Sequence, residues 1–309
     1  MAENTYWFHR NAFKFTNQLD FQAPELCNEG ECAKLLADLK MSRMDLVQSF
    51  YDYGVGREQL RQKYDRYVEL LLGLINAPGS GNNQPGKVTN AEKLGPIGAT
   101  DGNKSLMDKL NDKVGVLKVN SHKQCSVSLR HVFPFRWTDS LSIKPFTDPS
   151  LDRVDAVNDL IGITTNFGIG LMKRASCISA KESNDMNDAK EIHTCLKQAS
   201  GVFEYVKECL TGMLLQPVSS EATPYTDVDS RVLQCYAIQC KAETLEVTIA
   251  RGIALEHKEN LIASLSNDAQ ILYQEAYDLL KNTYDDNKVD TPLKWMKYFE
   301  LKQKFYETI

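Results

Sequence analysis

The side chains best suited to covalent or metal chemistry in this 309-residue chain are eight cysteines and five histidines. Cys27 and Cys32 form one close pair (CNEGEC), and Cys235 and Cys240 form another inside a helical pattern. Five positions turn a helix by about 500°, so the second pair does not share one helix face. Neither pair is accompanied by the further cysteines or histidines that complete a zinc site. We therefore interpret the thiols as reduced and inert, and expect no metal or cofactor.

No catalytic motif joins the remaining reactive side chains. The sequence has no GxxxxGK[ST] loop, no HExxH and no GxSxG. Gly168 and Gly170 fall inside an apolar run, where glycines favour close helix packing over phosphate binding. Carboxylates are spread along helix faces, which is typical of solvated surfaces. The histidines are scattered, at His9, His122, His131, His193 and His257. We expect no catalytic residues, and hence a protein that is not an enzyme.

Composition narrows the class of protein further. The chain is 42% hydrophobic and 25% charged, with a mean hydropathy of −0.38, as in soluble globular proteins. A net charge of −5 and a pI near 5.7 argue against nucleic acid as a general partner. No run of about 18 apolar residues appears, and the start MAENTYWFHRNAFKF has no signal-peptide core. The ending FYETI has no prenylation box. We expect a cytosolic protein without a transmembrane segment.

The elements that must position any site are helices. Apolar residues recur at three- and four-residue steps over Glu31–Ala77 (two helices), Val154–Lys173, Asp188–Leu215 and Thr291–Ile309. Asp188 is expected to cap the helix that follows it. Period-two alternation persists nowhere, so the predicted class is all-α. Consecutive antiparallel helices of this length favour a solenoid-like stack over a compact four-helix bundle.

The most informative stretch is Asp229–Ala276, which contains no proline and one glycine. Its apolar period predicts two amphipathic helices, and the polar run Glu256–Asn260 is short enough to fold the second back on the first. Leu261 and Leu265 lie one turn apart and share a face of the second helix. That face is either buried between stacked helices or open to a partner, and the residues alone leave both readings standing. A helical hairpin with a broad apolar surface is more typical of binding than of catalysis.

Two regions depart from the helical pattern, and the last helix has an unusual composition. Met1–Phe21 is aromatic and basic, and we expect an extended segment that packs its rings onto the body. Pro78–Lys104 is rich in Gly, Pro and Asn and predicts a mobile loop, inside an insertion over residues 78–127. The last helix is unusually aromatic where the chain stops, and a helical stack needs a polar cap. We therefore interpret the chain as truncated or as a short isoform.

Several segments, in order, resemble the Bro domain, which is shared by the Alix and Bro proteins of the ESCRT pathway. The matching segments are WFHRN (7–11), FRWTDSL (135–141), DAKEIHTCLKQASGVFEYVKE (188–208), AIQCKAETLEVTIARGIALEHKENLIASL (237–265) and KWMKYFELKQKFY (294–306). Within this family the chain is most similar to the BROX-like proteins. The resemblance implies one Bro domain over residues 1–309, incomplete at its C-terminus and with a low-order insertion at 78–127. It also implies an elongated, boomerang-shaped solenoid with tetratricopeptide-like core helices.

The resemblance further implies a non-catalytic adaptor for endosomal sorting or membrane remodelling. Its concave face would bind the C-terminal amphipathic helix of an ESCRT-III charged multivesicular body protein. Carried over residue by residue, the hydrophobic positions of the patch are Thr248, Leu261 and Leu265, and a basic position at its edge is Lys190. Thr248 stands where the Alix branch has an aromatic residue.

The expected protein is a monomer that is recruited to endosomal or nuclear-envelope membranes only through its partners. The alternatives are a helical-repeat adaptor for a peptide unrelated to ESCRT-III, and a truncated isoform with reduced binding.

Overall fold

A computed structural model describes residues 7–21, 30–76, 129–141, 146–148, 151–181, 185–214, 227–283 and 290–309. Within these ranges the regular structure is helical except for one pair of two-residue antiparallel strands, β1 (Phe135–Arg136) and β2 (Asp152–Arg153). The predicted all-α class is confirmed. The insertion predicted over residues 78–127 lies outside the described residues, so it stays a prediction, as does the single domain over 1–309.

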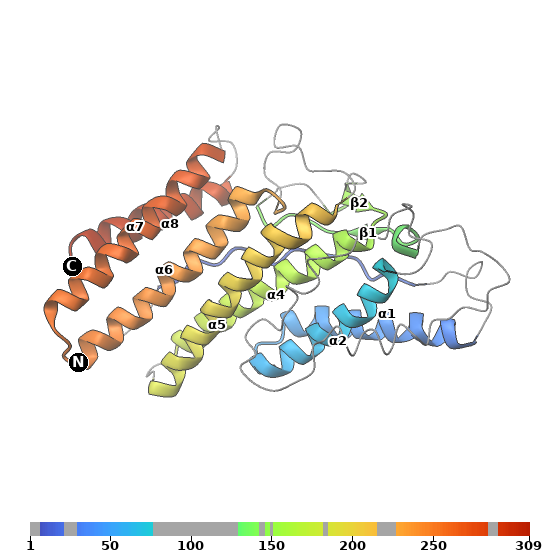
Figure 1. Ribbon diagram of the computed structural model, residues 1–309, viewed down its shortest axis with the longest axis horizontal. Coiled ribbons are helices and arrows are strands. Elements are labelled where there is room, and N and C mark those ends of the chain that lie inside the picture. Colours follow the sequence, from blue (N-terminus) through green and yellow to red (C-terminus); the bar gives the residue numbers. More distant parts are fainter. Residues whose placement is uncertain are drawn as a thin grey trace. The chain divides into compact units, whose positions relative to one another are not determined.

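The long helices follow the predicted order along the chain (Figure 1). They are α1 (Gly30–Phe50), α2 (Arg57–Ile75), α4 (Ala156–Ser179), α5 (Met186–Tyr205), α6 (Ser230–Ala254), α7 (Glu259–Thr283) and α8 (Asp290–Glu307). Short turns complete the set: the 3-10 helix η3 (Leu129–His131), the π-helical turn η5 (Val206–Leu210) and the 3-10 helix η6 (Thr211–Met213). The segment before α1 has no helix over its described part, residues 7–21, and buries Phe13 and Phe21 as predicted, but it leaves Trp7 and Phe15 more than half exposed.

The start of α5 differs from the prediction. Asp185, and not Asp188, is the N-cap, because its side chain accepts hydrogen bonds from the backbone N–H groups of Asn187 and Asp188. Asp188 instead occupies the third helical position, and its carboxylate accepts the backbone N–H of Asp185. The two aspartates therefore form a capping box. The sequence offered two acidic residues three positions apart, and the apolar period did not distinguish the cap from its partner.

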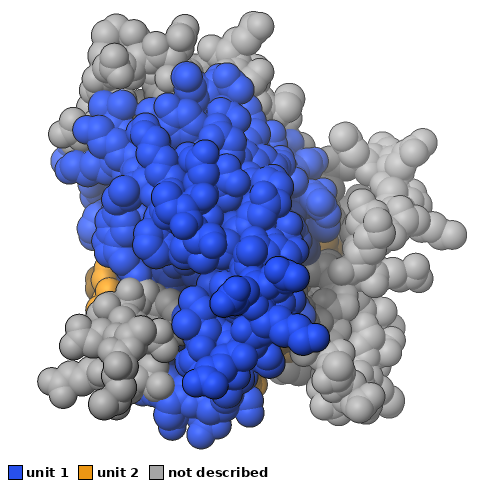
Figure 2. Space-filling view, turned by 90° about the vertical axis from the view of Figure 1, so that its left-hand side faces the viewer, with its two compact units in different colours: residues 1–15, 138–148, 164–309 blue, residues 16–137, 149–163 orange. Residues whose placement is uncertain are grey.

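The described chain divides into two compact units, coloured blue and orange in Figure 2. Unit 2 comprises residues 16–137 and 149–163. Its centre is the buried carboxylate of Asp159, which accepts hydrogen bonds from the Arg43 guanidinium, the Trp137 indole and the Tyr67 hydroxyl. Because every donor comes from a different part of the sequence, one carboxylate fixes α1, α2 and the segment after η3 together.

Unit 1 comprises residues 1–15, 138–148 and 164–309. Its helices pack in succession, α5 on α6, α6 on α7 and α7 on α8, and Figure 1 shows them as a row. Gly168 of α4 allows a close approach to α5, because a Cβ there would lie 2.8 Å from Cζ of Phe203. That ring is fully buried and stacks on Tyr236 of α6. The packing role predicted for Gly168 is confirmed.

We predict that Gly168→Ala lowers the free energy of unfolding by about 1–2 kcal/mol, because the added methyl overpacks the Phe203 ring. The matched control is Gly73→Ala in α2, where nothing lies within 4 Å of the added Cβ. This change should raise stability by up to about 1 kcal/mol, since alanine favours the helix. Denaturant unfolding of both variants is the measurement. Equal effects of the two substitutions would contradict the packing assignment.

A pH-dependent contribution to stability comes from Asp139. Burial and the nearby charge of Asp227 raise the pKa of Asp139 to about 6, whereas an unfolded aspartate titrates near pH ~4. The folded chain therefore holds this proton more tightly than the unfolded chain. The resulting stabilisation is complete below pH ~4 and is lost as the pH rises through about 6.

Asp139→Asn imitates the protonated carboxyl, so we predict that it raises stability at pH 7.5 by about 1–2 kcal/mol. At pH ~4 the wild type is itself protonated, and the substitution should change little. Thermal unfolding at both pH values is the measurement. An equal shift of Tm at the two pH values would mean that the pKa of Asp139 is not raised.

Candidate partner-binding site

Helices α6 and α7 form the predicted hairpin. The turn between them has no glycine at the position where a helix usually ends in the left-handed conformation. Asp229 caps α6 by accepting the backbone N–H of Arg231. At the other end Glu256 adopts a φ of 54°, in the left-handed region, and its N–H donates to the carbonyl of Ile253. The next N–H, of His257, donates to the carbonyl of Gly252 at 2.9 Å. This is a Schellman ending, formed here with glutamate at the position that usually holds glycine.

Three sides of α6 are covered, which determines where a site can lie. Helices α5 and α7 cover two flanks. The third side binds both α8 and the N-terminal segment through Gln239, whose amide donates to the carbonyl of His9 and whose oxygen accepts the Trp295 indole. One turn later Glu243 pairs with Arg10 at 2.7 Å. Among the described residues, α6 therefore presents one stripe to solvent between its first and last turns, and Ile253 in the last turn is also exposed.

The exposed stripe of α6 contains Thr248. Along it, Lys241 is exposed, and Thr244, Leu245 and Thr248 are partly exposed. The Thr248 hydroxyl donates to the carbonyl of Thr244 at 3.0 Å, so its hydrogen-bonding demand is met within α6. The γ-methyl is the part of Thr248 that remains for a partner. With threonine at position 248, the stripe is more polar than it would be with an aromatic residue there.

The two leucines of α7 lie beside this stripe. Leu261 is 48% exposed and Leu265 is partly buried, whereas Ile262 between them is only 8% exposed. Ile262 faces α6, since a Cβ built on Gly252 would lie 2.6 Å from its Cδ1. Gly252 is one turn beyond Thr248 in α6, and Ile262 lies between Leu261 and Leu265 in α7, so the three predicted residues all lie in the turns next to the Gly252–Ile262 contact. The sequence left open whether the face of α7 that carries Leu261 and Leu265 is buried between helices or open to a partner. For Leu261, burial is wrong, since the side chain is 48% exposed.

A basic edge runs along α5 on the same side. Lys190 and Lys197 are exposed, and His193 lies between them. The pKa of His193 is lowered by partial burial and then by the charges of Lys197 and Arg251, so Arg251 of α6 lies near this edge. Within the described part of the chain, no ion pair involves Lys190, Lys197 or Arg251. The sequence analysis predicted Lys190 as part of the site but not Lys197 or Arg251. The seven-residue step from Lys190 to Lys197 already indicates that both lysines lie on one face of α5.

The surface therefore combines an apolar strip with unpaired positive charge. Such a surface suits an amphipathic helix that carries acidic residues beside its apolar face. Among the described residues, no group of three His, Cys, Asp or Glu side chains could hold a metal ion. Over the same residues, no helix is both long and apolar enough to cross a membrane.

Paired substitutions on α7 test which face is open. We predict that Leu261→Asp changes the free energy of unfolding by no more than about 0.5 kcal/mol, because the side chain is half exposed in the first helical turn. Ile262→Asp would bury a charge against α6 and should cost more than about 4 kcal/mol. Thermal unfolding of the two variants is the measurement. Comparable losses would mean that Leu261 is part of the core.

Comparison with known sequences gives consistent matches. A family model described as BRO1-like domain matches residues 114–309. The human BRO1 domain-containing protein BROX is 32% identical over 302 residues, which cover 98% of this chain and 60% of that protein. The BROX homolog of Caenorhabditis elegans is 24% identical over the same coverage. The chain thus spans about 60% of the length of these relatives.

Solved structures show the same fold. A structure described as "Structure basis for endosomal targeting by the Bro1 domain" aligns with a TM-score of 0.59 and 17% identity, over 98% of this chain and 68% of that chain. The "ALIX BRO1 CHMP4C complex" aligns with a TM-score of 0.52 and 17% identity, over 96% and 69%. Identities this low establish likeness of fold alone.

Proposed function

This chain belongs to the BRO1-like domain family, and we propose that it is a non-catalytic adaptor of the ESCRT pathway. Its ligand is the C-terminal amphipathic helix of an ESCRT-III charged multivesicular body protein. The observation that supports the proposal is the exposure of Leu261, which is 48% exposed, with Leu265 partly exposed one turn later and with lysines on α5 that have no ion-pair partner among the described residues. A related BRO1 domain, that of ALIX, has been solved as a complex with CHMP4C.

Each proposed contact residue has a distinct role. Leu261 and Leu265 anchor the apolar face of the incoming helix, and most of the binding energy comes from burying them. The methyl of Thr248 extends this apolar contact onto α6. Lys190, exposed at the α5 edge, pairs with an acidic side chain that flanks the partner's apolar face.

The expected affinity is moderate. Two leucine anchors with few flanking contacts correspond to micromolar binding, about −8 kcal/mol. An adaptor of this affinity exchanges readily and gains strength when several ESCRT-III subunits are displayed together. We propose that the chain acts as a monomer in the cytoplasm and reaches endosomal or nuclear-envelope membranes through this partner.

We predict that Leu265→Asp weakens binding of a CHMP4C C-terminal helix peptide by about 2–4 kcal/mol, the cost of losing a hot-spot residue. The matched control is Leu301→Asp on α8, another exposed leucine outside the proposed contact. This control should leave the affinity unchanged. Isothermal titration calorimetry on the three proteins is the measurement, with thermal unfolding to verify that each is folded.

Two outcomes would contradict the proposal in different ways. Unaltered binding by Leu265→Asp would show that the peptide binds elsewhere on the chain. Absence of binding by the wild type would reject this ESCRT-III partner, and would favour an adaptor for another peptide or a form with reduced binding.

A further inference from the structure

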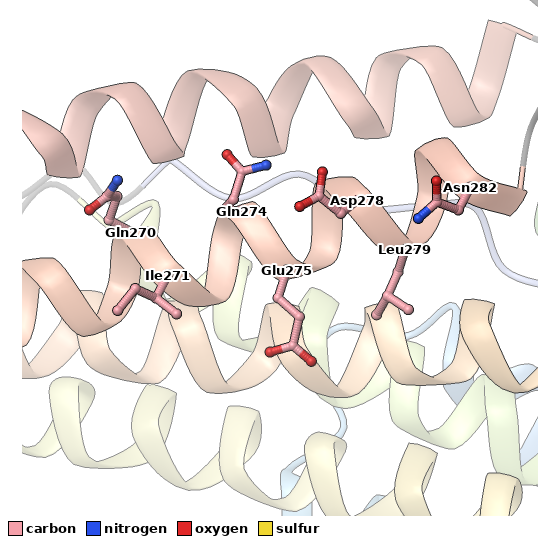
Figure 3. A pocket seen from close by; sticks show the side chains of 7 residues that line it. All are labelled: Gln270, Ile271, Gln274, Glu275, Asp278, Leu279 and Asn282. Carbon is pink, nitrogen blue, oxygen red and sulfur yellow. The ribbon is translucent and has the colours of Figure 1, made fainter.

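The row of leucines on α7 continues beyond the leucine pair, and the exposed Asp268 lies on the same face between Leu265 and Leu272. Leu272 and Leu279 follow Leu265 at seven-residue steps and are partly buried, as Leu265 is. The row from Leu261 to Leu279 covers 19 residues, and its ends are about 27 Å apart along the helix. Figure 3 shows Leu279 pointing to the same side of α7 as Ile271 and Glu275. A shallow, open hollow lies over this second half of the helix.

The two ends of the row differ in charge: cations are in excess at the closed end, where Glu256 and Glu259 are also exposed, and a carboxylate lies towards the other end. At the closed end of the hairpin are Lys190, Lys197 and Arg251, which have no ion-pair partner among the described residues. Towards the other end is Glu275, which is exposed, lines the hollow and points to the same side of α7 as Leu279, whereas the exposed Asp278 lines the hollow from the opposite side (Figure 3). Neither of these carboxylates has an ion-pair partner within the described ranges.

Glu275 is fixed at the seam between the two helices, because the Gln234 amide of α6 donates to its carboxylate at 3.4 Å. Arg251 precedes Gly252, which lies against Ile262. Glu275 is 13 residues further along α7, so about 20 Å separates the basic end from the acidic end. This separation exceeds the Debye length of about 8 Å at physiological ionic strength. The two ends therefore act on a ligand independently.

We infer that this row of leucines binds an amphipathic helix in a single direction, set by charge. The acidic end of the ligand lies against Lys190, Lys197 and Arg251, and its basic end lies against Glu275. In the reverse direction like charges meet at both ends, which destabilises that orientation. The inference rests on the proposed function, because it assigns the polarity of the same helix-binding surface. It also identifies the ligand class as a helix of about five turns with segregated charge.

The direct test uses a designed 18-residue amphipathic peptide with leucines on one face, glutamates in its first half and lysines in its second. A benzophenone is placed at either its acidic or its basic end, and cross-links to the full chain are mapped by mass spectrometry. The acidic-end probe should label residues 190–197 or 251–262, and the basic-end probe residues 271–282, each with at least tenfold preference. Equal labelling of both regions by either probe would overturn the inference.

A second experiment reverses the charges at the two ends of the row. A variant with Lys190→Glu, Lys197→Glu and Glu275→Lys should exchange the two labelling patterns. The control, Lys294→Glu with Lys297→Glu on the exposed part of α8, should keep the wild-type pattern. An unchanged pattern in the threefold variant would show that charge does not set the direction.

The outcomes separate this inference from the proposed function. If the designed peptide labels the chain in one direction but the CHMP4C peptide does not bind, the ESCRT-III partner is rejected and the inferred direction of helix binding stands. If the CHMP4C peptide binds but the designed peptide labels both regions equally, only the inferred direction of helix binding is rejected. If neither peptide binds, both proposals fail.

Discussion

Two buried carboxylates on α6 determine how the rest of unit 1 is arranged. Glu243 pairs with Arg10 and Glu246 pairs with Lys302, each at 2.7 Å and almost without solvent contact. Burial raises the pKa of Glu246, an effect that the charge of Lys302 opposes. Leaving either charge unpaired would cost about 3–5 kcal/mol. The N-terminal segment and α8 must therefore both lie on this side of α6.

The position of the proposed binding surface follows from that constraint. With two elements held to one side by ion pairs and with α5 and α7 on the flanks, α6 retains one exposed stripe between its first and last turns. The stripe lies between the α5 lysines and the α7 leucines, and Thr248 lies on it. The surface thus owes its position to polar contacts on the opposite side of the same helix. Its chemistry is supplied by three helices, which explains how an apolar strip and a basic edge come to lie next to each other.

Local sequence patterns predicted the helices well and the contacts between them poorly. The apolar period indicated the α6–α7 hairpin and the shared face of Leu261 and Leu265, because three- and four-residue spacing is a property of one helix. The period did not reveal what covers that face. Leu261 and Ile262 are neighbours in an apolar segment, and only the packing against Gly252 separates the exposed side chain from the buried one. The strands β1 and β2 were missed, since two-residue strands produce no alternation.

Long-range polar pairing carries no local signal at all. Arg10 and Glu243 are 233 positions apart, and nothing near either residue marks it as buried. The same holds for Arg251, which joins the basic edge of α5 only because the hairpin brings it there. Lys197 is different, since its seven-residue step from Lys190 was readable in the sequence.

The most direct test of the account is a leucine-methyl NMR titration of the full chain with the CHMP4C C-terminal helix peptide. We predict saturable shifts at the methyls of Leu261, Leu265 and Leu272, and none at Leu301 of α8, which is about as exposed as Leu261. Saturable binding that shifts Leu301 and leaves Leu261 and Leu265 unchanged would contradict it.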